Sequence, residues 1–310
     1  MGYTRSTSAD WTAYSSTTST KSRDKIFTSR SLTTEMDPMG VRMREARDSD
    51  LNPESTPIII GTDITGSMGY LAEHIVKEGL ATLFKEIYER KPVTDPQVLP
   101  MAIGDATQWD RAPFQIGQFE ADLTAAKWLE KIYIEGGGGG NGFESYDLPY
   151  YFAAFHTSTD AFEKRNKKGY IFTIGDEEAP PSTTVNSIKK VLAEDGDGLE
   201  VDMPFKDVIE RASKMYHCFH IMIAQGHHAK HYAKEVQESW REVLGQNAIW
   251  LEDHEKLAET IVSIIQVING EDKETVVNSW SGDTSLVVAD AIKELDTTTT
   301  YDDAMKVVRF

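Results

Sequence analysis

The chain has 310 residues, 32 of them basic and 50 acidic, which gives a formal net charge of −18. This length can bury the core of one large α/β domain with extensions. Because so negative a chain repels phosphate backbones, we expect no nucleic-acid partner. No apolar run approaches the roughly 18 residues of a membrane-spanning helix, and Cys218 is the one cysteine. These features favour a soluble protein of the cytoplasm, or of a particle assembled there, with no disulfide framework and no membrane partner.

The N-terminal segment, residues 1–57, differs in composition from the rest. Seventeen of the first 35 residues are serine or threonine, which leaves little apolar surface to offset the entropy of ordering. We therefore predict a flexible arm, followed over residues 36–57 by a charged lead-in that ends at Pro53 and Pro57. The folded domain is expected to begin near Ile58.

Apolar runs and helical periodicities alternate after that point. Residues 58–62 form the first expected strand, and a helix follows it because apolar residues recur at three- and four-residue spacing. The apolar positions of this helix are Val76, Leu80, Leu83 and Ile87. Two short apolar runs, 98–104 and 114–119, are separated by a polar loop, as in a hairpin. One strand of an otherwise parallel sheet is therefore predicted to be antiparallel.

The second half of the chain continues the alternation. The further strands are expected at 170–174, 218–224 and 248–251, and the further helices at 123–132, 150–156, 205–216, 232–243 and 257–268. This order predicts an α/β fold with a doubly wound, mostly parallel six-stranded sheet that spans residues 58–270. Residues 271–310 are interpreted as a C-terminal extension, with a helix near residues 286–295.

Three polar clusters follow expected strands: DITGS at 63–67, GGGGGNGFES at 136–145 and GDEE at 175–178. Ligands of doubly wound sheets bind at the carboxyl ends of strands, so these clusters are candidates for one site. Asp63, Thr65 and Ser67 stand at alternate positions and can turn one carboxylate and two hydroxyls toward a common point. Oxygen-only ligands favour Mg²⁺, or Mn²⁺ at similar geometry.

These motifs resemble the von Willebrand factor A family and its metal-ion-dependent adhesion site. Asp63, Thr65 and Ser67 match the D-x-S/T-x-S element in the form DxTGSM, and Asp176 matches the distal aspartate. The middle loop is similar to a glycine-rich subtype, GGG-(D/N)-x-x-E, with ligand candidates from the second loop. These candidates are Asn141, Glu144 and Ser145.

The resemblance implies a Rossmann-like sheet with one antiparallel edge strand and no catalytic activity. It also implies that Mg²⁺ or Mn²⁺ keeps one coordination position open for an aspartate or glutamate of a protein partner. Intracellular members of the family often serve as adaptors of a separate AAA+ ATPase. An alternative from another class is a structural subunit of a large assembly such as a virion, held to its neighbours by the N-terminal arm and the C-terminal extension.

Other interpretations of the same residues are possible. In DITGS, Thr65 or Ser67 could cap a helix without any metal. The order Asp63 then GDEE also resembles haloacid dehalogenase phosphatases, but Thr65 stands where their acid/base aspartate would be and cannot protonate a leaving alkoxide. Asp105 could support the metal ligands or simply belong to a loop.

Two further clusters are interpreted as structural. Five histidines lie between residues 217 and 231, yet no third zinc ligand accompanies the pair His227 and His231, so we expect strand and helix-start positions. The acidic segment 194–202, EDGDGLEVD, lacks the spacing of a calcium-binding EF-hand and is expected to be a solvated loop.

Overall fold

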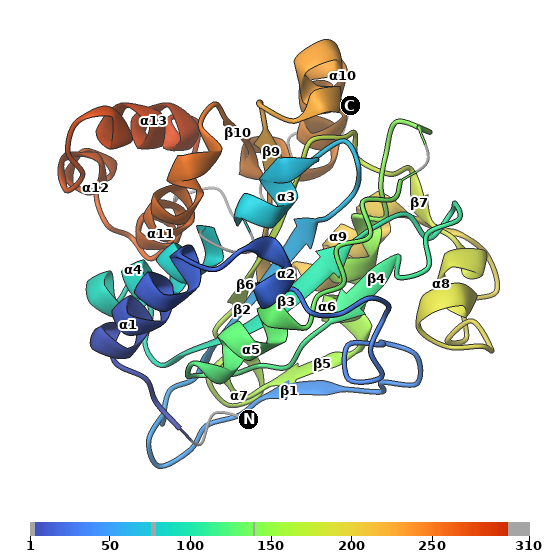
Figure 1. The fold of residues 1–310 in the computed structure, drawn as a ribbon, viewed down its shortest axis with the longest axis horizontal. Coiled ribbons are helices and arrows are strands. Elements are labelled where there is room, and N and C mark those ends of the chain that lie inside the picture. Colours follow the sequence, from blue (N-terminus) through green and yellow to red (C-terminus); the bar gives the residue numbers. More distant parts are fainter. Residues whose placement is uncertain (1–3, 76–78, 139, 297–310) are drawn as a thin grey trace.

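The computed structural model describes residues 4–75, 79–138 and 140–296, and its central element is a six-stranded sheet (Figure 1). The strand order is β10-β9-β6-β2-β3-β4, and every neighbouring pair is parallel except β3 and β4. The bounds are β2 Thr56–Asp63, β3 Pro96–Ile103, β4 Phe114–Ile116, β6 Gly169–Gly175, β9 Tyr216–Ile223 and β10 Ala248–Leu251. The predicted fold class is therefore confirmed, including the antiparallel strand at one edge.

The helices and two small sheets surround this sheet. The helices are α1 Ser8–Ser19, α2 Arg23–Ile26, α3 Tyr70–His74, α4 Leu80–Arg90, α5 Thr124–Glu130, α6 Asp147–Phe155, α7 Asp160–Arg165, α8 Val185–Val191, α9 Phe205–Ala212, α10 His227–Leu244, α11 Leu257–Ile268, α12 Lys273–Asn278 and α13 Asp283–Ile292. The small sheets pair β1 Arg44–Ala46 with β5 Thr157–Thr159 and β7 Ser182–Thr183 with β8 Met203–Pro204. Val76 of the predicted first helix lies outside the described residues.

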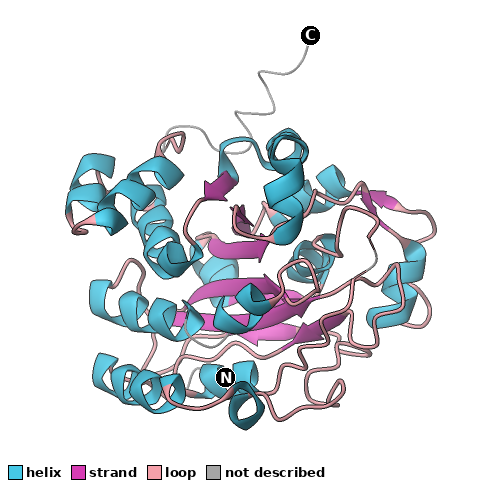
Figure 2. Cartoon of the chain, turned by 45° about the horizontal axis from the view of Figure 1, so that its top comes forward, coloured by secondary structure: helices cyan, strands magenta, loops and turns pink. Residues whose placement is uncertain are grey.

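Helices cover both faces of the sheet, and Figure 2 shows it between them. Successive side chains of a strand point to opposite faces. In β2, Ile58 and Ile60 therefore pack with α1, α4, α5 and α11 on one face, whereas Ile59 packs with α6, α9 and α10 on the other. Because both faces are covered, the central strands are buried and mostly apolar, which is the pattern that made them visible in the sequence. In the described part of the chain, no helix is both long enough and apolar enough to span a membrane.

The N-terminal segment is not the flexible arm that its composition predicts. Residues Ser8–Ser19 form α1, whose first turn is closed by reciprocal hydrogen bonds between Thr7 and Asp10. Trp11 is completely buried, and its ring stacks on Phe84 of α4 with 4.4 Å between the ring centroids. One large aromatic side chain therefore anchors a helix that is otherwise poor in apolar residues, which an average over composition does not reveal.

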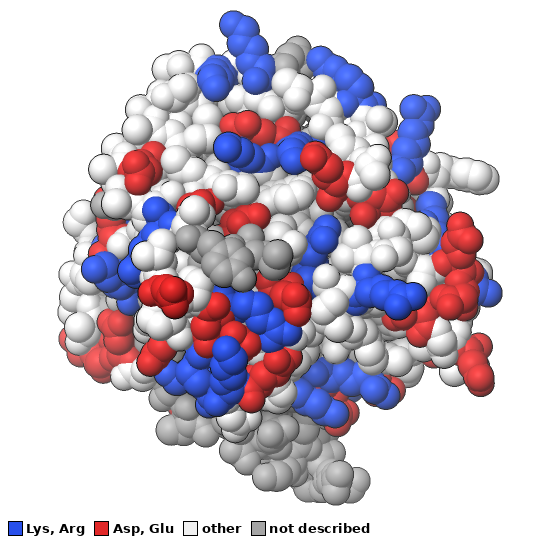
Figure 3. Space-filling view, turned by 90° about the horizontal axis from the view of Figure 1, so that it is seen from below, with Lys and Arg blue, Asp and Glu red and all other residues white. Residues whose placement is uncertain are grey.

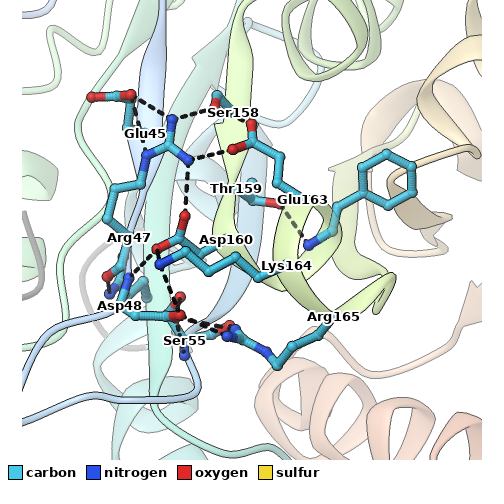
Figure 4. A network of polar contacts seen from close by, with 12 residues as sticks. Glu45, Arg47, Asp48, Ser55, Ser158, Thr159, Asp160, Glu163, Lys164 and Arg165 are labelled. Atoms are coloured by element: carbon cyan, nitrogen blue, oxygen red, sulfur yellow. Dashed lines mark hydrogen bonds and ion pairs between the residues drawn. The ribbon is translucent and has the colours of Figure 1, made fainter.

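Ion pairs fix the lead-in before β2 to the segment around α7 (Figure 4). Arg47 contacts Asp160 at 2.9 Å and Glu163 at 2.7 Å, and Asp48 contacts Arg165 at 2.7 Å. These contacts supplement the backbone pairing of β1 with β5. The face of the molecule seen from below carries basic and acidic side chains side by side (Figure 3), so the net charge of −18 produces no uniform acidic surface there.

The C-terminal extension is folded as far as residue 296. Helices α12 and α13 pack on α11, and Val276, Val288, Ile292 and Leu295 are buried in the same core as α1. The predicted helix near residues 286–295 corresponds to α13. The rest of the predicted extension, residues 297–310, lies outside the described residues.

Replacing Trp11 by alanine tests the packing of α1. We expect the loss of a fully buried indole to lower the free energy of unfolding by about 3–5 kcal/mol. Urea denaturation followed by circular dichroism measures this change. The matched control is Trp109→Ala, since Trp109 is 94% exposed and its replacement is expected to stay within about 0.5 kcal/mol. Equal effects of the two substitutions would show that α1 does not pack on α4 as described.

Candidate metal site

Two predicted ligands lie at the ends of neighbouring parallel strands. Asp63 is the last residue of β2, and Asp176 directly follows β6. Because β2 and β6 are paired in parallel, both carboxylates stand at the same edge of the sheet. Both residues are completely buried.

A continuous series of oxygen atoms joins the two carboxylates. Asp63 Oδ1 accepts hydrogen bonds from the Thr65 backbone N–H at 2.8 Å and from Thr65 Oγ1 at 2.6 Å. Thr65 Oγ1 and Ser67 Oγ are 3.1 Å apart, and Ser67 Oγ donates to Asp176 Oδ1 at 2.7 Å. Neighbouring ligands of an octahedral Mg²⁺ with bonds of 2.0–2.1 Å are about 2.9 Å apart. The three successive oxygen–oxygen separations in this series, 2.6, 3.1 and 2.7 Å, are close to that distance.

The outer oxygens of both carboxylates are also held. Tyr146 Oη donates to Asp63 Oδ2, and the His228 backbone N–H, at the start of α10, donates to Asp176 Oδ2 at 2.9 Å. Sequence reasoning missed Tyr146. The nearest signal was Gly175, because a Cβ at this position would lie 2.1 Å from Tyr146 Oη, so that only glycine makes room for the ring.

The glycine run is fixed against the first loop rather than being a free linker. The Gly66 N–H donates to Gly137 O at 2.7 Å, and the Gly138 N–H donates to Asp110 Oδ1 at 2.9 Å. The other oxygen of Asp110 accepts from the Asp105 N–H at 2.8 Å. Asp110, a second residue that sequence reasoning missed, therefore joins the glycine run to the loop after β3.

The three candidates of the middle loop lie differently. Glu144 Oε1 and Thr65 Cβ both adjoin Gly138, at 2.6 Å and 3.2 Å from where a Cβ on that glycine would stand. Asn141 instead donates to Thr107 Oγ1 at 3.2 Å, and Ser145 Oγ accepts from the Ala106 N–H at 2.8 Å. The structure brings Glu144 beside the first loop and directs Asn141 and Ser145 toward the loop after β3.

Burial dominates the electrostatics of the acidic groups. It raises the pKa of Asp63 to about 8, with the nearby charge of Asp176 adding to the effect, and it raises the pKa of Asp176 and Glu144 as well. The pKa of Glu177 rises to about 7 for the same reasons. Crowded buried carboxylates without cations favour protonation, and a divalent ion would remove that preference.

Several buried oxygens near the site have no hydrogen-bond partner among the described residues. They are Asp105 Oδ2, Asn141 Oδ1, Glu144 Oε2 and Glu177 Oε2. No three histidine, cysteine, aspartate or glutamate side chains of the described chain converge closely enough to hold a metal by themselves. A metal here would therefore depend on the hydroxyls of Thr65 and Ser67, in agreement with the donor set that the motif suggests.

The residues that the alternative interpretations singled out lie in ordinary strand, helix and loop positions. Asp105 Oδ1 accepts from the Thr107 N–H at 2.7 Å, as in a loop turn. His217 and His220 lie in β9, where the His220 ring stacks on Trp240 at 3.5 Å, and His227 begins α10. In the acidic segment, Asp195 Oδ1 accepts from the Asp197 N–H at 3.0 Å. The histidine positions agree with the interpretation made from the sequence.

No protein-family model matches the chain, and no curated protein does. Solved structures with a similar course include the pilus adhesin SpaC of Lactobacillus rhamnosus GG, with 9% identity, a TM-score of 0.44, and coverage of 73% of this chain and 31% of the adhesin. A von Willebrand factor type A protein of Catenulispora acidiphila shares 13% identity over 69% of this chain and 42% of its own, with a TM-score of 0.36. BatB of Bacteroides thetaiotaomicron shares 12% identity over 70% of this chain and 100% of its own, with a TM-score of 0.39. The chain thus spans less than half of the first two proteins, and at these scores the likenesses carry no conclusion about function.

The pH dependence of stability tests the electrostatics of the site. Asp63 and Glu177 hold protons more tightly in the folded state than at the ordinary carboxyl pKa of about 4 in the unfolded state. Their contribution to stability is therefore complete below about pH 4 and is lost as the pH rises through about 7 to 8. We expect the melting temperature of metal-free protein to fall from pH 5 to pH 8, and to fall less in Asp63→Asn. Parallel curves for the two proteins would contradict this assignment.

Proposed function

We propose that the chain is a non-enzymatic, divalent-metal-dependent protein-binding module. The observation that carries this proposal is the series of oxygens from Asp63 through Thr65 and Ser67 to Asp176, with successive separations of 2.6, 3.1 and 2.7 Å. These four side chains would hold Mg²⁺ or Mn²⁺, and Glu144 would border it. The proposal also accounts for the resemblance of the three loops to the von Willebrand factor A motifs.

The donor set supports an ion that stays electrophilic. Two of its four members, Thr65 and Ser67, contribute neutral hydroxyls, so they do not reduce the positive charge of the ion. A divalent cation held in this way would gain from an additional carboxylate in its open position. When bound, the ion would supply a Lewis-acidic point of attachment for an aspartate or glutamate of a partner.

Exposed aromatic side chains near the site loops support a protein as the partner. Trp109, beside Asp110 in the loop after β3, is 94% exposed, and Tyr70, which directly follows the DITGSMG loop, is 73% exposed. Large exposed aromatics are costly on a free surface and are enriched at protein interfaces. The metal would then lie within a surface already suited to contact.

A phosphatase is the less favoured alternative. The hydroxyl of Thr65 donates to Asp63 Oδ1, so it occupies the place of the acid/base aspartate without being able to donate a proton to a leaving alkoxide. Asp63 is itself engaged on both oxygens, by Thr65 and Tyr146. These contacts favour a positioning role for Asp63 over a nucleophilic one.

In this proposal the module serves as an adaptor for a separate AAA+ ATPase. The structural-subunit alternative would use the N-terminal segment for contacts between copies. Removing residues 1–50 does not separate the two, because Trp11 belongs to the core of the domain. Substitutions at the site are the cleaner test.

Calorimetry tests the metal. We expect Mg²⁺ and Mn²⁺ to bind the purified chain, and Asp63→Ala or Ser67→Ala to weaken the binding roughly tenfold or more, because each removes a donor. Asp207→Ala, an exposed acid on α9, is the matched control and should leave the affinity unchanged. The proposal fails if wild-type protein binds neither ion, or if Asp63→Ala binds as well as wild type.

Affinity purification tests the partner. Immobilised wild-type chain should retain one or more proteins of a native extract in Mg²⁺ and release them in EDTA, because the carboxylate of the partner would have no attachment without the ion. The Ser67→Ala chain is expected to retain them poorly under either condition. Retention that is equal in Mg²⁺ and EDTA would speak against a metal-dependent module.

A further inference from the structure

A surface pocket of about 500 Å³ lies next to the proposed metal position. Its walls come from the first loop, the glycine run, the segment after β6 and the start of α10. The lining residues are Gly66, Ser67, Gly137, Gly138, Gly140, Glu144, Glu177, His227, His228, His231 and Tyr232. Ser67 belongs to both the pocket and the metal site, so a molecule in the pocket would adjoin the ion.

Two carboxylates of this pocket pair with no lysine or arginine among the described residues. Glu144 is 1% exposed and Glu177 is 5% exposed, and the Oε2 atom of each is buried without a partner among the described residues. Neither forms an ion pair in the described part of the chain, and the residues that line the pocket include no lysine or arginine. A buried carboxylate oxygen without a hydrogen bond is costly, so these two Oε2 atoms point to a missing donor.

The charge balance leads to the same conclusion. Asp63, Asp176, Glu144 and Glu177 would bring four negative charges when ionised, and a divalent ion offsets two of them. A partner that supplied only a carboxylate would increase the excess. A partner that also brought a cationic side chain would reduce it.

The opposite wall of the pocket is aromatic. The rings of His228 and Tyr232 are 4.7 Å apart and inclined by 32°, and Tyr232 is 51% exposed at a point where α10 departs from helical geometry. Aromatic faces attract cations, and the planar guanidinium group stacks on them while its N–H groups remain free to donate to carboxylates.

We propose that this pocket binds an arginine side chain of the same partner whose aspartate or glutamate meets the metal. The inference rests on the proposed function, because it places the two partner residues side by side. Arginine fits better than lysine because its planar group can stack on an aromatic ring while its several N–H groups donate to carboxylate oxygens. A second metal ion is the competing occupant of the pocket, and a Mn²⁺ titration distinguishes the two.

Labelled peptides with blocked ends test this pairing. Each peptide carries one aspartate and one arginine, in either order and separated by up to three glycines, and a matched series carries neutral citrulline in place of arginine. Fluorescence anisotropy with full-length protein in saturating Mg²⁺ should show the best arginine peptide binding roughly tenfold more tightly than its citrulline partner. Glu144→Gln and Glu177→Gln should each bring this ratio toward one. Asp207→Asn is the control, because Asp207 is an exposed acid on α9 and lies outside the lining.

The outcomes separate this inference from the proposed function. If citrulline peptides bind in Mg²⁺ and not in EDTA, but arginine adds nothing at any spacing, the pocket assignment is wrong and the metal-dependent module stands. If arginine improves binding equally in Mg²⁺ and EDTA, the pocket stands and the metal-dependent module is wrong. A Mn²⁺ titration that ends at two ions per chain, the second lost in Glu177→Gln, would make the pocket a metal site and overturn the inference.

Discussion

Two buried carboxylates with a serine hydroxyl between them determine how the loops at the carboxyl ends of the strands are arranged. Asp63 and Asp176 end neighbouring parallel strands, and Ser67 lies between them at 2.7 Å from Asp176. Burial and mutual repulsion raise the pKa of Asp63, so the pair is costly to ionise without a cation. The surrounding contacts fix the pair from outside, through Tyr146 on one carboxylate and the start of α10 on the other. The loops of the site are therefore arranged around two buried carboxylates that hydroxyl and backbone donors hold in place.

The central sheet could be predicted from the sequence because its physical signal is local. Strands covered on both faces are mostly apolar, so β2, β6 and β9 are visible as short, largely apolar runs with polar residues after them. The first loop could be predicted for a related reason, since Asp63, Thr65 and Ser67 stand at alternate positions of one five-residue segment. Both predictions depend on neighbours in the sequence.

What could not be predicted depends on contacts between distant segments. Trp11 packs on Phe84, 73 positions later in the chain, and no local pattern in a serine- and threonine-rich segment indicates that contact. Asp110 and Tyr146 reach the site from other loops, and neither stands in a motif with recognisable spacing. Glu177 follows Asp176 in the predicted GDEE cluster, so its place near the site could be predicted. That it lines a pocket could not, because the pocket wall is built from distant segments.

The proposed metal and the proposed arginine pocket account for different members of one group of buried carboxylates. In this proposal the hydroxyls of Thr65 and Ser67 would hold a hard cation, and Glu144 and Glu177 would leave negative charge beside it. A partner segment with one acidic and one basic side chain would contact both the ion and the pocket. Exposed Trp109 and Tyr70 would then contact the apolar parts of the same segment.

The most direct test of the metal site is a crystal structure of the chain grown with Mn²⁺, with anomalous diffraction recorded to locate the ion. The account predicts one strong peak within bonding distance, about 2.0–2.2 Å, of Thr65 Oγ1 and Ser67 Oγ, beside the carboxylates of Asp63 and Asp176. A map with no peak near these hydroxyls, at a Mn²⁺ concentration that saturates binding in solution, would contradict it.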